Sequence, residues 1–304
     1  MVNYFKIENN KLVESNLEDS IVIIYKKPEK NEMNYLISAY GMDEHNVNSS
    51  IDPDELGRIE FEEDHIMFLL KRPKDYSNED NLLFKVTSVG VFIFKDKMII
   101  IMPEDIQIFE GRQSFKLNSL LDVLLKLLFG TISHFLGHLK VINMISDSLE
   151  QKINTSMENK FLINMFTLEK SLVYFLNGIN SNSVLFEKMK AAAARIGFTP
   201  DNLSLLDDII IENTQCYKLA EIYANVLSGI TAARAAIVSN NLNVLMKTLN
   251  IITISIMVPT FVVSVFSMNV GIPMQDKPFA FWVIMGLSAV SIILTSIFWK
   301  LKRW

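Results

Sequence analysis

The sequence has little of what catalytic and nucleic-acid-binding proteins use. Its single cysteine, Cys216, excludes a disulfide within the chain and argues against a cysteine-based metal site. It contains no glycine-rich phosphate loop and no nucleophile elbow. It also has no cluster of basic and aromatic residues. We therefore expect no enzyme activity, no small organic substrate and no nucleic-acid partner.

An apolar leader is also missing. No hydrophobic core follows the charges of the first 16 residues, so we expect no signal peptide and a cytosolic start. The formal charge is −5 overall and +4 from Asn243 onward, which leaves −9 on the preceding residues. An acidic cytosolic body would concentrate cations near a transport path, although acidity also serves solubility alone.

Charge is absent between Leu249 and Met268. A helix of about 20 residues crosses a hydrocarbon core about 30 Å thick. A second apolar run, 279–299, follows after a short turn, so we expect two transmembrane helices and a cytosolic C-terminus. The basic residues after the second run agree with the positive-inside tendency: Lys300, Lys302 and Arg303.

One face of the first predicted span carries polar and methionine side chains, while the opposite face is purely apolar. Its members recur at steps of three and four residues and so share one side of a helix. Such a face lines a pore or packs against another helix, and the pattern alone leaves both possibilities open. The members are Asn243, Met246, Asn250, Thr253, Met257, Thr260 and Ser264.

The first predicted span ends in Ser267-Met268-Asn269. This end resembles the CorA family of magnesium and cobalt transporters, in which a Gly-Met-Asn triplet closes the first of two C-terminal spans. The preceding stretch VSNNLNVLMKTLNIITISIM is similar to the family's helix entering the membrane, without a gap up to the triplet. Ser267 replaces the family's glycine, Pro259 lies one place later than in the usual Met-Pro pair, and the acidic loop between the spans is absent.

The resemblance implies an α+β membrane protein. It would have an N-terminal cytosolic α/β domain, a long helical stalk continuous with the first transmembrane helix, and a C-terminal transmembrane hairpin of two helices. The expected segments are 1–116 (α/β domain), 117–200 (cytosolic helices), 201–248 (stalk), 249–268 (pore-lining span), 269–278 (external loop), 279–299 (second span) and 300–304 (basic cytosolic tail).

The function implied by the resemblance is a channel for divalent cations in the cell (cytoplasmic) membrane. Mg²⁺ uptake would be driven by the membrane potential and gated by cytosolic Mg²⁺. The alternatives are a transporter for Zn²⁺, Co²⁺ or Ni²⁺, and a non-conducting membrane-anchored sensor or partner subunit. Two spans cannot enclose an ion path, so chains must assemble in the lipid bilayer, and the resemblance implies a homopentamer.

Specific residues follow from the same alignment. The family's pore rings map onto Asn243, Met246, Leu249, Met257, Thr260 and Asn269, and the helix face adds Asn250, Thr253 and Ser264. Ion selectivity at the pore mouth maps onto Ser267, Met268 and Asn269, although Asn269 could instead cap the helix in a left-handed conformation. Regulatory Mg²⁺ in the family lies between an acidic residue of the α/β domain and the long helix of a neighbouring subunit, where Asp208 aligns.

Other possible metal ligands occur in the predicted cytosolic part. His134 and His138 are four residues apart on a predicted helix, but Phe135 stands where a metalloprotease has glutamate, and no third ligand is evident. Carboxylates could hold a hard divalent ion or simply be solvated surface: Glu60, Glu62, Glu63, Asp64, Asp207 and Asp208.

Local patterns predict the secondary structure. Apolar runs predict strands at 21–25, 65–71, 82–87, 91–95 and 98–102, with the last two forming a hairpin. We expect helices at 31–40, from Asp52-Pro53, at 157–176 and from a break at 178–183 to 196. The stretch 117–151 predicts a buried helix because charged and histidine residues interrupt it. From Asp201 a helix meets no proline before Pro259.

Overall fold

The protein is described by a computed structural model that covers residues 1–76, 82–104, 116–155, 159–271 and 277–301. Its contacts divide the chain into two compact units, Met1–Thr231 and Ala232–Trp304. Asp276, Lys302 and Arg303 lie outside the described residues, so the predicted charges of the loop and tail are only partly covered.

The first unit contains a mixed seven-stranded sheet in the order β2-β1-β3-β7-β6-β5-β4. Only β3 and β7 pair in parallel, and every other neighbouring pair is antiparallel. Central strands are buried on both faces, which explains their continuous apolar sequences. The strands are β1 (Val2–Glu8), β2 (Lys11–Glu14), β3 (Val22–Lys26), β4 (Arg58–Phe61), β5 (His65–Pro73), β6 (Val86–Phe94) and β7 (Met98–Met102).

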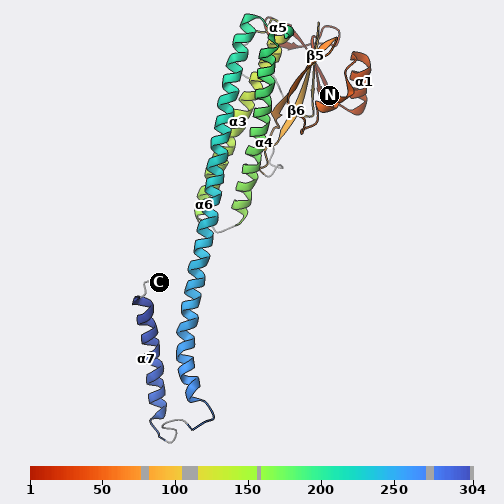
Figure 1. Ribbon diagram of the computed structural model, residues 1–304. Coiled ribbons are helices and arrows are strands. Elements are labelled where there is room, and N and C mark those ends of the chain that lie inside the picture. Colours follow the sequence, from red (N-terminus) through yellow and green to blue (C-terminus); the bar gives the residue numbers. More distant parts are fainter. Residues whose placement is uncertain (77–81, 105–115, 156–158, 272–276, 302–304) are drawn as a thin grey trace. The chain divides into compact units, whose positions relative to one another are not determined.

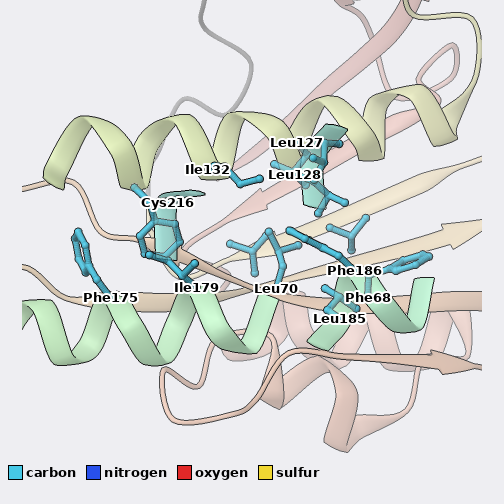
Figure 2. Close-up of a cluster of buried hydrophobic side chains, with 14 of the residues drawn as sticks. Phe68, Leu70, Leu127, Leu128, Ile132, Phe175, Ile179, Leu185, Phe186 and Cys216 are labelled. Carbon is cyan, nitrogen blue, oxygen red and sulfur yellow. The ribbon is translucent and has the colours of Figure 1, made fainter. Parts of the chain in front are cut away.

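Helices cover both faces of this sheet, giving three layers (Figure 1). Alternate residues of β5 face opposite sides: Phe68 and Leu70 join the larger core, and Met67 and Leu69 the smaller one. The smaller core lies under α1 (Lys30–Tyr40) and α2 (Glu44–Ser49). The larger core lies under the helices α3 (Leu120–Thr155), α4 (Asn159–Ala191) and the first part of α6 (Pro200–Phe266), shown in Figure 2.

Most strands expected from apolar runs are confirmed. They include β3, β5, β7 and the antiparallel hairpin of β6 and β7. The strand expected at 91–95 is the end of β6, which is continuous from Val86 to Phe94. The separate strand expected at 82–87 is wrong, because only its last two residues are in a strand and they belong to β6. Ser88 and Gly90 interrupt its apolar pattern for a structural reason. The Ser88 hydroxyl donates to the carbonyl of Asp52, and a Cβ on Gly90 would lie 1.9 Å from Ser50 Oγ.

The helix expected from Asp52-Pro53 is also wrong. Residues 51–57 form turns, in which the Asp52 carboxylate accepts from the backbone N–H of Asp54 at 2.9 Å. The actual short helix, α2, lies earlier, and the Asp43 carboxylate caps it by accepting from Asn46 N–H at 3.1 Å. An aspartate that stabilises a turn and one that caps a helix have the same local sequence signature.

Strands β1, β2 and β4 were not predicted. They lie at or near the sheet edges and are only partly buried, so they lack the apolar runs of the central strands. The sequence contained one signal for the first two of these strands, the pair Asn9-Asn10. These residues join β1 to β2 with φ values of 51° and 61°. Two consecutive positive φ values are typical of the two-residue turn that closes a β-hairpin.

Helix α4 runs without interruption through residues 178–183, so the predicted break is wrong. Gly178 lies against the sheet, where a Cβ would be 3.0 Å from Val86 Cγ1. Asn182 is fully buried; its amide oxygen accepts from Lys71 N–H and its amide nitrogen donates to the Lys71 carbonyl, both at 2.7 Å. Residues that resemble helix breakers thus serve the contact of α4 with β5 and β6.

Among the described residues, three helices are long and apolar enough to cross a membrane: α3, α6 and α7 (Ala280–Leu301). Helix α3 packs on the sheet, with Leu124, Leu128 and Phe135 fully buried, which confirms the predicted buried helix. The most apolar windows of α6 and α7 have no buried residue. A single chain therefore leaves the apolar surface of these two helices uncovered, as expected where lipid or other subunits surround them.

Helix α6 is continuous over 67 residues, about 100 Å at 1.5 Å per residue. It begins after α5 (Ala193–Ile196) and the left-handed Gly197, and it passes through Pro259 to end at Phe266. The predicted continuity of the stalk helix with the first apolar span is confirmed. The two units are therefore joined within one helix, without an intervening loop.

Candidate ion-conducting face of helix α6

The polar face predicted on the first span is exposed along its whole length. It includes side chains that would rarely remain in contact with solvent, such as Met246 and Met257, and Leu249, which was mapped from the family's pore rings, is exposed as well. We call this surface the α6 polar face, defined by Asn243, Met246, Leu249, Asn250, Thr253, Met257, Thr260 and Ser264. No described residue of the same chain buries these side chains.

The C-terminal half of the α6 polar face lines an open hollow of about 530 Å³. Four predicted pore residues contribute to it: Thr253, Met257, Thr260 and Ser264. Sequence reasoning did not assign Ile252, Ile256 and Phe261, which complete its lining from neighbouring positions of the same helix. The other four residues of the face lie nearer the N-terminal end of α6 and outside this hollow.

The hydroxyl groups of the face are oriented by the helix backbone. Thr253 Oγ1 donates to the Leu249 carbonyl at 2.9 Å, and Thr260 Oγ1 donates to the Ile256 carbonyl at 2.7 Å. Each hydroxyl hydrogen is engaged within the helix, so the oxygen keeps its lone pairs for an outside donor. The shell of a hydrated cation presents water hydrogens outward, and such acceptors are the groups that it needs.

The triplet follows directly after the last residue of α6. Ser267 closes a final turn, in which its N–H and its hydroxyl both donate to the Ser264 carbonyl, at 3.1 and 2.9 Å. Ser267 is not among the residues with positive φ. A serine in place of the family's glycine therefore causes no backbone strain in this conformation.

Asn269 also lacks the left-handed backbone that a helix cap of the expected kind requires. The cap interpretation of Asn269 is therefore wrong. Its side chain is exposed and makes no hydrogen bond with any residue in the described part of the chain. No described residue therefore occupies this amide at the end of α6.

Helix α7 has aromatic pairs near both ends. Phe281 and Trp282 have ring centroids 5.6 Å apart, and Phe298 and Trp299 have centroids 5.9 Å apart. The two pairs are separated by about 24 Å along the helix at 1.5 Å per residue. Aromatic side chains at this spacing are typical of the two interfaces of a bilayer.

The acidic residues of the first unit differ in their surroundings. Asp208 is exposed on α6 and has no hydrogen bond or ion pair with the described residues, whereas Asp207 pairs with Lys190 at 2.7 Å. Glu60 accepts from Asn46 and Arg58. Burial raises the pKa of Glu60, but these hydrogen bonds outweigh burial and lower the pKa overall. Glu60 is therefore a structural partner of Arg58 rather than a free metal ligand.

Glu62, Glu63 and Asp64 remain exposed in the turn between β4 and β5. Among the described residues, none of the acidic residues considered from the sequence belongs to a group of three possible metal ligands. A regulatory site at Asp208 would thus need a residue from another chain.

Comparisons with known proteins cover nearly the whole chain. The sequence model of a family described as "CorA-like Mg2+ transporter protein" matches residues 19–303. The cobalt/magnesium transport protein CorA of Methanocaldococcus jannaschii is 22% identical over 297 residues, which cover 91% of this chain and 89% of that protein.

Solved structures show the same fold. The complete structure of the CorA magnesium transporter from Methanocaldococcus jannaschii has a TM-score of 0.80 at 19% identity, covering 98% of this chain and 96% of that one. The full-length CmaX protein has a TM-score of 0.71 at 14% identity, covering 100% and 97%. The cytoplasmic domain of ZntB from Vibrio parahaemolyticus has a TM-score of 0.58 at 13% identity, covering 79% and 97%.

Proposed function

Because the chain belongs to the family of CorA-like Mg2+ transporter proteins, we propose that it conducts Mg²⁺ into the cell along the α6 polar face. The single observation that carries this proposal is the exposed row of acceptor oxygens on α6, which leads to the exposed Asn269 amide. Several chains, each contributing one α6, would enclose the path, since two spans are too few to surround it.

The chemistry of the face favours a hydrated, oxygen-preferring ion. Mg²⁺ loses its waters reluctantly and needs hydrogen-bond acceptors for them rather than a cage of carboxylates. The α6 polar face provides hydroxyl and amide oxygens and contains no histidine, cysteine or carboxylate that would hold a dehydrated transition metal. Transport of Co²⁺, Ni²⁺ or Zn²⁺ is the alternative. Among these ions, Co²⁺ is favoured by the name of the relative from Methanocaldococcus jannaschii, a cobalt/magnesium transport protein.

The apolar side chains of the α6 polar face would close the ion path, and the membrane potential would drive uptake through it. Rings of Met246, Leu249 and Met257 do not bind Mg²⁺, and when narrow they would close the path by excluding water. The membrane potential supplies about 2.3 kcal/mol per charge per 100 mV, and therefore about twice that for a divalent cation moving inward. Cytosolic Mg²⁺ bound near Asp208 would hold the closed state.

Mg²⁺ uptake by the purified protein in proteoliposomes tests the proposal. With a potential that is negative inside, a Mg²⁺ indicator in the lumen should report uptake that grows with the potential. Co²⁺, Ni²⁺ and Zn²⁺ in parallel assays would reveal a different preferred ion. The absence of uptake for all four ions would instead support the non-conducting sensor or partner subunit.

The assembly is expected to be a homopentamer in the cell membrane, with both chain ends in the cytosol. Native mass spectrometry in mild detergent should give a mass near five times 34.7 kDa. The physical reason is that the exposed α6 face needs neighbouring copies to cover it. A monomer or dimer at working concentration would contradict a pore built from this face.

Asp208 is expected to bind regulatory Mg²⁺ together with a residue of a neighbouring chain. Mg²⁺ should then slow proteolysis of the first unit in the full-length protein, and Asp208→Ala should remove most of this protection because a ligand is lost. Asp201, which is exposed in the first turn of the same helix, provides the control. Equal protection of wild type, Asp208→Ala and Asp201→Ala would identify Asp208 as ordinary surface.

A further inference from the structure

Two histidines and one aspartate converge in the first unit, apart from the α6 polar face. The Nε2 atom of His134 lies 3.1 Å from Asp75 Oδ1 and 2.8 Å from the Nε2 atom of His138. All three potential ligand atoms lie within 4.8 Å of one another. The histidines are one turn apart on α3, and Asp75 comes just after β5, so the fold brings together residues that are distant in sequence.

The hydrogens available cannot satisfy both contacts of His134. A neutral imidazole has one N–H and one acceptor nitrogen. If His134 Nε2 carries the hydrogen, it can point fully toward Asp75 or toward His138, but not toward both. If that nitrogen carries no hydrogen, its lone pair faces the Asp75 carboxylate, which is also an acceptor. Every tautomer therefore leaves one short contact without a well-directed hydrogen bond.

A metal ion requires neutral imidazole, in which one ring nitrogen keeps its lone pair. The Nε2 atoms of His134 and His138 face each other at 2.8 Å, so both can bind the same ion.

We propose that Asp75, His134 and His138 bind a transition-metal ion such as Zn²⁺, which fastens the segment after β5 to helix α3. Imidazole suits Zn²⁺, Ni²⁺ and related ions, whereas Mg²⁺ prefers oxygen ligands alone. Metal–ligand bonds of about 2.0–2.1 Å place tetrahedral ligand atoms about 3.3–3.4 Å apart. The observed 2.8 and 3.1 Å need only small movements of the rings and the carboxylate to reach that spacing.

The surroundings provide access and set the role of the carboxylate. The Asp75 side chain is 62% exposed, so an ion and a water molecule as fourth ligand can reach the site from solvent. The guanidinium of the buried Arg72 works against a bound cation, and the Asp75 carboxylate offsets its charge. Removal of this carboxylate would leave the metal ion and Arg72 as uncompensated like charges.

The test uses the full-length protein in mild detergent, freed of metal by a chelator and then kept in excess Mg²⁺ to fill oxygen-ligand sites. Calorimetric titration with Zn²⁺ should show one high-affinity site per chain. Asp75→Asn, which alters an exposed side chain, should weaken this binding by at least about tenfold. Titration with Co²⁺ should give the visible absorption of a nitrogen-ligated ion, and His134→Gln should abolish this absorption.

The matched control is His45→Gln, which changes an exposed histidine outside the site. It should bind Zn²⁺ as the wild type does. Circular dichroism verifies the fold of each variant, and if His134→Gln does not fold, Asp75→Asn decides. Unchanged Zn²⁺ affinity and Co²⁺ absorption in Asp75→Asn would overturn the proposal. Mg²⁺ uptake is not part of this test, so its outcome is independent of the transport function.

Discussion

Replacing Asn269 by alanine is expected to reduce Mg²⁺ uptake in proteoliposomes by at least about tenfold while leaving the oligomer intact. Asn269 follows the end of α6, its amide is exposed, and its backbone does not need the left-handed conformation. Alanine therefore removes only the amide. Each lost hydrogen bond to a water of the arriving ion is worth about 1 kcal/mol, and a ring of chains loses several at once. A tenfold effect on the rate corresponds to about 1.4 kcal/mol.

Two further variants sharpen this test. Ser267→Gly restores the family's residue beside Asn269 and should retain uptake, because the Ser267 backbone is unstrained with either residue. Asn269→Asp should bind cations more tightly and release them more slowly, since a ring of charges replaces a ring of dipoles. Normal uptake by Asn269→Ala, with native mass spectrometry showing the intact assembly, would remove Asn269 from the ion path.

Asn182→Ala is expected to destabilise the first unit strongly, lowering the free energy of unfolding by about 2–6 kcal/mol. The Asn182 amide is fully buried and pairs with both the N–H and the carbonyl of Lys71, each at 2.7 Å. Alanine leaves two buried backbone groups of β5 without these partners, and each such group costs about 1–3 kcal/mol. Denaturant unfolding followed by circular dichroism measures the change.

The control is Asn180→Ala, two residues earlier on the same helix and exposed. It has the same chemical change and the same helix propensity effect, so the difference between the two variants isolates the contact with β5. A similar, small loss for both variants would show that the Asn182 amide contributes little to the packing of α4 on the sheet.

The buried strands and the long helix were predictable because their local sequences had no alternative. The β-branched run at β3 and β7 is typical of a strand buried on both faces. The absence of proline between Asp201 and Pro259 predicted one continuous helix. By contrast, β1, β2 and β4 lie at or near the sheet edges and are partly exposed, so their pairing depends on neighbouring strands more than on their own apolar content.

The helix break expected at 178–183 is a case in which the local sequence led to the wrong prediction. Gly178 and Asn182 have low helix propensity, and local reasoning predicts that a helix stops there. Contact with β5 and β6 overrides this preference, because the glycine permits close approach and the asparagine satisfies buried backbone groups of the sheet. The partners, Val86 and Lys71, are too distant in sequence for any local pattern to reveal them.

The sequence by itself determined the two apolar spans, the polar face of the first span and the triplet that follows it. These features depend on helical periodicity and on the cost of placing charge in lipid, both of which are local properties. Only the tertiary structure decided that Glu60 accepts a hydrogen bond from Arg58, that Asn269 is not a left-handed cap, and that Asp75 lies beside His134 and His138. Such outcomes depend on which distant segments the fold brings within hydrogen-bonding distance, and periodicity within one segment carries no information about that.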